Sequence, residues 1–325
     1  MEFRHLQAVA AVAEHGSFTG AADALGTVQS NISSHIARLE RELGTTLVDR
    51  STGRLTAEGE VVLARAYRIM AEVDALTSDL GALRAEVTGV VRAGMIGTTA
   101  RWLVPYLLAQ CARSHPKLRL VVAEGTNSSL DPMLGAGRLD LAIMTLPVPG
   151  RDLVSEPLFA EELLLVVPTD PDEDPLGGAT KATIAELGKL ELLLPAPGTA
   201  FRAELDTAAK PLGVRLRPKA ELDGVRLIAS LTFEGHGPAV LPATAVPMHL
   251  RERFRPVAIE GLSARRVGLV LRNRGLPSAA ASAVLAILRK LMADTAALPE
   301  GIHPIRTAPA QGTEGALRAI GVPNG

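Results

Sequence analysis

The stretch "TVQSNISSHIARLERELG", residues 27–44, decides how this chain is interpreted, because its apolar and polar side chains separate on a helix. With 100° per residue, Val28, Ile36, Leu39 and Leu43 all lie within about 40° of Ile32. The opposite face carries short polar side chains and arginines, namely Ser30, Ser34, Ala37 and Arg41, with Asn31, Ser33 and Arg38 beside them. A helix that meets only water has no need of such a face, so we expect it to bind a partner.

The preceding stretch, "GSFTGAADALGT" at residues 16–27, predicts a second helix packed against the first. Ser17 is a good N-cap, and apolar residues follow at positions 18, 21, 22 and 25. Gly26 can end this helix and Thr27 can begin the next, so the two form a helix-turn-helix. Its second helix would lie in the major groove of DNA. The candidate DNA-binding residues there are Gln29, Ser30, Asn31, Ser33, Ser34 and Arg38, to which Arg50 and Arg54 are added below.

The alternative interpretation of this region is an ordinary helical hairpin with a polar exterior. Overall charge does not separate the two, because residues 1–59 carry five arginines against seven acidic residues. Four of those arginines, however, fall between positions 38 and 54. A local basic patch therefore exists inside an acidic segment.

The same segment resembles the LysR-type transcriptional regulators. The resemblance runs through "FTGAADALG" (18–26), "QSNISSHIARLERELGTTLVDR" (29–50) and "GRLTAEGE" (53–60). It implies a winged helix-turn-helix in residues 1–59, with Gln29, Ser30, Ser33 and Ser34 facing the DNA and a wing near residues 50–54 reaching its backbone. The family often has proline at the position of Ser30 and arginine at that of Ser34, so a cationic contact at residue 34 is missing here.

Residues 60–88 predict a long linker helix that serves for dimerisation. Apolar residues recur at Val62, Ala66, Ile69, Val73, Leu76, Leu80, Leu83 and Val87, with alternating spacings of four and three. This heptad pattern favours a self-complementary seam, which would present two recognition helices to two half-sites. A helix of this kind could instead dock on its own domain. The resemblance implies an antiparallel pair of linker helices, in a dimer or a dimer of dimers.

From residue 89 the pattern changes to short β-rich runs that alternate with helical stretches, which predicts an α/β domain with a parallel sheet. "VVRAGMI" (90–96), "LRLVVAE" (118–124) and "LDLAIMT" (139–145) belong to one group of strands. "LLLVVP", "ELLLPA" and "AVLPA" form a second group, and "RRVGLVLR" (265–272) with the helix that follows returns to the first. We therefore expect lobe I at residues 89–162 and 266–300, lobe II at 163–265, and a flexible tail at 301–325. This arrangement resembles the family's effector-binding domain, itself similar to periplasmic solute-binding proteins.

Polar residues at the strand ends and helix starts of the two lobes are the candidate effector-binding residues. They are Thr98, Thr99, Asn127, Ser128 and Thr145 in lobe I, and Thr199, Phe201 and Arg202 in lobe II. Each could simply be a helix cap. Taken together they favour a small, carboxylated effector, for which Arg202 could supply the positive charge.

Composition and missing motifs exclude several other classes. The 325 residues carry a net charge of −1 and a single cysteine, Cys111, so no internal disulfide framework is possible and a reducing compartment is expected. The first residues do not resemble a signal peptide, and "LELLLPAP" is too short to span a membrane, so we expect a cytoplasmic protein without a membrane partner. No metal, dinucleotide, phosphate-loop or nucleophile-elbow motif occurs, so we expect no enzyme, cofactor or metal.

Two functions remain after these exclusions. The first is a regulator that binds double-stranded operator DNA and responds to a small-molecule effector. The second is a small-molecule-binding protein whose helical head serves only for dimerisation. The polar face of residues 29–38 and the absence of a signal peptide favour the first.

Overall fold

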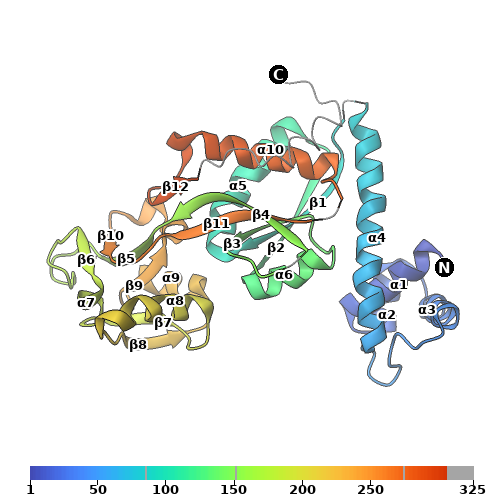
Figure 1. The fold of residues 1–325 in the computed structure, drawn as a ribbon, viewed down its shortest axis with the longest axis horizontal. Coiled ribbons are helices and arrows are strands. Elements are labelled where there is room, and N and C mark those ends of the chain that lie inside the picture. The colour runs from blue at the N-terminus through green and yellow to red at the C-terminus, as the bar shows by residue number, and fades with distance from the viewer. Residues whose placement is uncertain (85, 151, 274, 306–325) are drawn as a thin grey trace.

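The computed structural model describes residues 1–84, 86–150, 152–273 and 275–305. The chain begins with a helical head formed by α1 (Phe3–His15), α2 (Phe18–Ala24) and α3 (Gln29–Leu43), against which the long helix α4 (Ala57–Ala82) packs (Figure 1). Ile32, Ile36 and Leu39 are at most 1% exposed in the core of this head. The middle of the apolar side predicted at residues 27–44 is therefore buried, whereas Val28 and Leu43 at its two ends are 59% and 43% exposed, which corrects the prediction for these two residues.

The turn between α2 and α3 forms largely as predicted. Ser17 caps α2 by accepting a hydrogen bond from the Gly20 amide, and Gly26 follows the helix with φ +61°, a conformation that glycine adopts easily. One detail was wrong: Val28, not Thr27, is the N-cap of α3. The Thr27 hydroxyl instead accepts a hydrogen bond of 2.9 Å from the side-chain amide of Asn31.

Helix α4 ends earlier than its heptad pattern predicts. The helix stops at Ala82, and Leu83 is its C-cap, so the last two predicted seam positions lie outside it. The chain turns back after Ala82, so that the Glu86 amide donates to the Gly81 carbonyl at 3.2 Å and a Cβ atom on Gly81 would lie 3.0 Å from the Glu86 carbonyl oxygen. Val87 consequently packs against the core of lobe I and takes no part in a seam.

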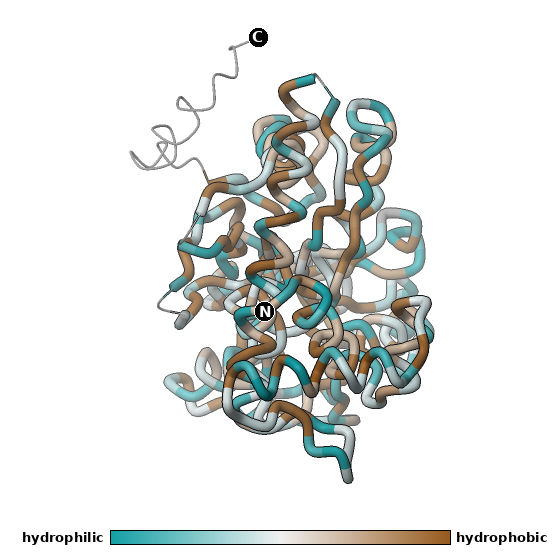
Figure 2. The backbone as a smooth tube through the Cα atoms, turned by 90° about the vertical axis from the view of Figure 1, so that its right-hand side faces the viewer, coloured by the Kyte–Doolittle hydropathy of each residue, from teal (hydrophilic) through white to brown (hydrophobic). Residues whose placement is uncertain are grey.

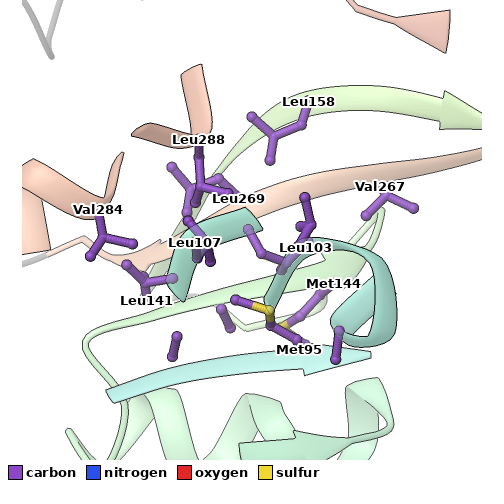
Figure 3. Close-up of a cluster of buried hydrophobic side chains, with 14 of the residues drawn as sticks. Met95, Leu103, Leu107, Leu141, Met144, Leu158, Val267, Leu269, Val284 and Leu288 are labelled. Atoms are coloured by element: carbon purple, nitrogen blue, oxygen red, sulfur yellow. The ribbon is translucent and has the colours of Figure 1, made fainter. Parts of the chain in front are cut away.

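Lobe I is a mixed sheet with strand order β12-β4-β11-β3-β1-β2. Strands β1 (Gly89–Ile96), β2 (Leu118–Gly125) and β3 (Leu141–Thr145) are parallel, whereas β4 (Leu153–Glu161) and β11 (Arg265–Arg272) run antiparallel to each other. Helices α5 (Gly97–Ser114), α6 (Asn127–Gly135) and α10 (Ala279–Ala293) pack on this sheet. Side chains from α5, α10 and the central strands interlock in the core, including Met95, Leu103, Leu107, Leu269 and Leu288 (Figure 3).

The predicted flexible tail begins with an ordered strand. Strand β12 (Ile302–Pro304) pairs with β4 at the edge of the sheet, and Ile302 is 5% exposed. This short strand corrects the prediction for residues 302–304, because an apolar side chain and a free strand edge hold them in place. Residues 306–325 lie outside the described part of the chain.

Lobe II contains two small sheets, with strand orders β6-β10-β5-β9 and β7-β8. Its strands are β5 (Leu163–Pro168), β6 (Lys181–Thr183), β7 (Glu191–Pro195), β8 (Arg217–Leu222), β9 (Ala239–Pro242) and β10 (Phe254–Glu260). Its α-helices are α7 (Ile184–Leu187), α8 (Ala200–Ala209) and α9 (Val225–Phe233), and the 3₁₀ turn η2 (Ala243–Ala245) follows β9. The chain crosses between the lobes after β4 and again before β11, which confirms the predicted two-lobed α/β fold.

Hydrophobic and hydrophilic segments alternate along the backbone in Figure 2. Within the described ranges, no helix has the length and apolar character needed to cross a membrane.

Candidate DNA-binding surface and effector cleft

The polar face of α3 is accessible in the structure. Gln29, Ser30, Asn31 and Ser34 are exposed, and Ser33 is half-buried. The Asn31 amide is held by Thr27 at 2.9 Å, which fixes one end of this face. Short, accessible donors and acceptors on a helix with a buried opposite side are what base edges in a major groove require.

The predicted arginines lie around this face in exposed ion pairs. Arg38 is 60% exposed, and its guanidinium is 3.5 Å from Glu2. Arg50 is 58% exposed and 3.5 Å from Glu40, a side chain that also accepts hydrogen bonds from the Leu47 and Val48 amides. The Arg38–Glu2 pair is exposed on both sides and contributes at most about 1 kcal/mol, and the Arg50 side chain stays exposed although Glu40 is only 14% exposed, so DNA phosphates can reach both arginines.

A tight turn forms the wing. Val48 and Leu55 make an antiparallel bridge, and the segment between them closes on Asp49, whose carboxylate accepts hydrogen bonds from the Ser51 hydroxyl and amide at 2.6 and 2.8 Å. These bonds hold the pKa of Asp49 below its ordinary value. The turn leaves Arg54 exposed beside the bridge.

Four apolar side chains form an exposed stripe along α4. Ile69, Val73, Leu76 and Leu80 are 40%, 43%, 61% and 54% exposed, respectively, and we call them the α4 stripe. Two other predicted seam residues differ: Val62 packs against the head core, and Leu83 is the 83%-exposed C-cap.

A different side of α4 docks on lobe I through polar contacts. The Ser78 hydroxyl accepts a hydrogen bond from the Ala280 amide at 3.0 Å, and Asp79 accepts one from the Ala279 amide at 2.8 Å. Arg92 pairs with Asp74 at 3.0 Å. The bonds to Ser78 and Asp79 give hydrogen-bond partners to two backbone amides in the first turn of α10. All these contacts leave the α4 stripe exposed.

Thr98 and Thr99 lie in the first turn of α5, directly after β1. Their exposed fractions are 6% and 0%. The Thr99 hydroxyl oxygen is buried without a hydrogen-bond partner among the described residues. Because a buried hydroxyl without a partner is costly, this atom is suited to a polar ligand group.

The other lobe I candidates bond to the protein itself. The Asn127 amide donates to the Thr145 carbonyl at 2.6 Å and accepts from the Thr145 backbone amide at 3.1 Å. The Ser128 hydroxyl shares a hydrogen bond of 2.9 Å with the Thr126 hydroxyl. The structure thus brings Asn127 and Thr145 together as a clamp between α6 and β3.

In lobe II, the side chain expected to supply a positive charge is already paired. The Arg202 guanidinium donates to Glu221 at 2.8 Å, to Asp206 at 3.1 Å and to the Pro195 carbonyl at 3.1 Å. Thr199 caps α8 by accepting from the Arg202 amide. The Arg202 side chain, 14% exposed, is therefore held within lobe II by two carboxylates and a backbone carbonyl.

Sequence reasoning missed a buried polar cluster where the chain crosses between the lobes. Arg265 donates to Glu161 at 2.6 Å, and Glu161 also accepts from the amide and hydroxyl of Thr244 in η2. The Arg265 guanidinium stacks over the ring of Phe201 at 5.4 Å. Burial raises the pKa of the nearby Glu204. The signal in the sequence was weak: Glu161 stands at the end of β4, and Arg265 stands at the start of β11.

A second missed contact bridges the two lobes. Arg226 at the start of α9 pairs with Glu124 at the end of β2, at 2.9 Å. Gly97 lies beneath this pair, because a Cβ atom there would be 2.8 Å from the Glu124 carboxylate.

A cavity lies away from the expected cleft, between α4 and lobe I. Its volume is about 120 Å³, and it is lined by Arg68, Glu72, Gly135, Asp152, Arg272 and Gly275. Among the described residues, no group of three or more His, Cys, Asp or Glu side chains could hold a metal ion.

Two family models match the chain. "Bacterial regulatory helix-turn-helix protein, lysR family" matches residues 3–60, and "LysR substrate binding domain" matches residues 84–293. A probable hydrogen peroxide-inducible genes activator of Streptomyces viridosporus is 35% identical over 295 residues, which cover 89% of this chain and 94% of that protein. The transcriptional dual regulator OxyR of Escherichia coli is 27% identical, over 84% of this chain and 90% of its own.

Solved structures share the fold at lower identity. A full-length OxyR variant from Pseudomonas aeruginosa superposes with a TM-score of 0.70 at 22% identity, over 95% of this chain and 99% of that one. Full-length CbnR in complex with its target DNA gives a TM-score of 0.64 at 23% identity, over 90% and 99% of the two chains.

Proposed function

Because this chain belongs to the LysR family of transcriptional regulators, we propose that it binds operator DNA as a dimer and changes that binding when a small effector enters the cleft between its lobes. It is a DNA-binding regulator and not an enzyme. Because a regulator acts where the chromosome is, we infer that the protein works in the cytoplasm. The alternative, a binding protein whose head only dimerises, does not fit a head that matches a DNA-binding family.

The accessible polar face of α3 carries the DNA-binding part of the proposal. Gln29 and Ser33 are the candidates for reading bases, whereas Arg38, Arg50 and Arg54 surround them as candidates for phosphates. Ser30, Asn31 and Ser34 complete the contact surface. A basic rim around a polar centre is how a helix is positioned on a duplex and then reads it.

The α4 stripe supports the dimer. Four large apolar side chains at heptad spacing are exposed to water in the single chain, and burying them against a second α4 would remove that surface. The polar docking of α4 on its own lobe I leaves this stripe available. Two dimers could join through further surfaces into a tetramer.

The unpartnered Thr99 hydroxyl is the observation that supports an effector in the cleft. A small ligand with a polar group could satisfy it, with Thr98 in the same turn and the Asn127–Thr145 clamp at a neighbouring strand end. The expected carboxylate is not supported, since the positive charge assigned to it is neutralised by Glu221 and Asp206. We therefore propose a small polar effector and drop the requirement for a carboxylate.

The relatives named as peroxide-inducible activators raise the question of whether this chain senses peroxide by thiol chemistry. A disulfide needs two cysteines, and these 325 residues contain one. Cys111 is 4% exposed, and burial raises the pKa of its thiol, which disfavours the reactive thiolate. We propose that the response does not pass through this cysteine.

Two measurements test the proposal. Fluorescence anisotropy with duplex DNA from the intergenic region beside the gene should show tighter binding than to a random duplex of equal length. A thermal-shift screen of small polar compounds should identify one that stabilises the wild-type chain and alters its DNA affinity.

A matched pair of variants locates the effector. Thr99→Val should lose the stabilisation by that compound and keep effector-free DNA binding. Thr232→Val, which removes a buried hydroxyl that already donates to the Ile228 carbonyl, should keep the response. A normal response in Thr99→Val would place the effector elsewhere.

A further inference from the structure

Helix α6 begins at the strand ends where the effector is proposed to bind, and it ends at the linker helix α4. At its first residue, Asn127 is clamped to Thr145 by two hydrogen bonds of 2.6 and 3.1 Å. At its last residue, the Gly135 carbonyl accepts two hydrogen bonds from Arg68 of α4, from Nη2 at 2.8 Å and from Nε at 3.2 Å. Figure 1 shows α6 on the side of lobe I that faces α4.

The contact at the C-terminal end of α6 is unusually close. Gly137 has φ +82°, and a Cβ atom there would lie 3.2 Å from the Arg68 Cα atom and 3.3 Å from its nitrogen. The next residue, Arg138, lies over the Tyr67 ring at 5.3 Å. Only a residue without a side chain fits between these backbones, so the turn after α6 lies in direct contact with the backbone of α4.

Helix α6 is anchored in the core of lobe I. Its nine residues span about 13 Å, and Leu130 and Leu134 are fully buried in the core of lobe I. Packed elements of this kind shift between discrete positions more readily than they bend. A shift of the whole helix at Asn127 therefore also displaces Gly135, although Pro132 in its middle removes one backbone hydrogen bond.

The receiving end lies next to the DNA-binding head. Tyr67, adjacent to Arg68, donates its hydroxyl hydrogen to Glu14 of α1 at 2.8 Å and is 9% exposed. The head, α4 and lobe I thus meet within two consecutive residues of α4.

We propose that Arg68 is a positioning residue through which α6 transmits a change at the effector cleft to the DNA-binding head. The effector end of this route rests on the function proposed above. A ligand that alters the Asn127–Thr145 clamp shifts α6, and the two bonds to Gly135 carry that shift into α4. Helix α4 carries the proposed dimer contact and packs against the head. A shift of α4 therefore changes how the recognition helix α3 is oriented relative to that of the second protomer.

The distance between head and lobe I tests this without DNA or effector. Spin labels are attached to the full-length chain at two exposed positions, Asp23→Cys in the head and Arg113→Cys in lobe I, with Cys111→Ser as the background. Double electron–electron resonance then measures the distance between the two labels. Arg68→Met, which keeps the apolar stem but cannot donate, should broaden or shift the distance distribution. Arg68→Lys, which can still donate to Gly135, should stay near the parent. Arg65→Met, an exposed arginine on the same helix, is the matched control and should change nothing.

The cleft end is tested with Asn127→Ala. The expected result is a shift in the same direction as that of Arg68→Met, and no additional shift when both changes are combined. Thr183→Ala, which removes a helix cap in lobe II, should leave the distances unchanged. An unchanged distribution in Asn127→Ala, or fully additive shifts in the double variant, overturns the inference. Failure of the wild-type chain to prefer intergenic DNA would instead contradict the proposed function.

Discussion

Glu161 and Arg265 are directly opposite each other in β4 and β11 and form an ion pair of 2.6 Å at the crossing between the lobes, with side chains 0% and 9% exposed. Thr244 of lobe II donates two further hydrogen bonds to the same carboxylate. One buried acid therefore joins both crossing strands and a turn of the second lobe.

Removing the charge of Glu161 should destabilise the chain severely. Glu161→Gln leaves the Arg265 guanidinium buried without its counter-ion, a loss of about 3–5 kcal/mol in the free energy of unfolding. Chemical denaturation measures it. The exposed pair of Lys117 and Glu86 is the control, since Lys117→Met should cost at most about 1 kcal/mol. A cost below about 1 kcal/mol for Glu161→Gln would contradict a stabilising role of this ion pair at the crossing between the lobes.

The α4 stripe should be needed for dimerisation. Leu76→Asp places a carboxylate in the middle of the apolar seam, so sedimentation should show monomers or unfolded protein, with DNA binding lost. Leu212→Asp is the matched control, because both leucines are 61% exposed and Leu212 lies on lobe II away from α4. A stable Leu76→Asp dimer that still binds DNA would rule out the seam.

Acid should destabilise the head through His5. This imidazole is 1% exposed and lies 5.4 Å from the ring of His35 on α3. Burial is the main cause that lowers the pKa of His5. The charge of Glu2 raises this pKa, whereas the charges of His35, Arg38 and the N-terminus lower it further. A pKa lowered by folding means that the unfolded chain binds the proton more strongly. Stability is therefore fully present above the ordinary value of 6.5 and falls as the pH drops below it.

Thermal unfolding of the full chain between about pH 7 and pH 5, followed by circular dichroism, measures this loss. His5→Gln, whose side-chain oxygen can still accept a hydrogen bond from the Glu2 amide, should flatten the pH dependence. His15→Gln, an exposed histidine at the other end of α1, should retain it. An unchanged slope in His5→Gln would assign the effect to other groups.

Peroxide should leave DNA binding unchanged. Cys111 is buried on α5 in the core of lobe I, and its raised pKa keeps it in the unreactive thiol form. The wild-type chain and Cys111→Ser should bind intergenic duplex DNA equally before and after treatment with hydrogen peroxide. A peroxide effect seen in the wild type and abolished in Cys111→Ser would show that this thiol senses oxidation.

Much of the fold follows from local patterns in the sequence. The buried side of α3 and the cap at Ser17 depend on residues within one or two helical turns, so periodicity predicts them. The end of α4 was missed because its heptad pattern continues into Leu83 and Val87, although the helix ends at Ala82 and the chain then turns back. The order of residues 302–304 was missed because it depends on the edge of β4, far away in sequence.

The candidate site was harder to predict, because its charges are set by distant partners. For Arg202, the sequence offers Asp206 one helical turn away as a partner, but it gives no sign of Glu221 on β8, which also pairs with the guanidinium. The Glu161–Arg265 pair joins residues 104 positions apart, and no spacing rule connects them. Polar residues at strand ends could be identified from the sequence, whereas which of them remain unpartnered, such as Thr99, required the structure.

Sequence-specific DNA binding through α3 is the central claim, and one measurement tests it directly. Gln29→Ala and Ser33→Ala are titrated by anisotropy against intergenic and random duplexes at one salt concentration. Each should lose about 1–3 kcal/mol of binding free energy on the specific duplex and little on the random one, while Arg54→Ala should lose equally on both. Equal losses on both duplexes for Gln29→Ala and Ser33→Ala would contradict base reading by α3.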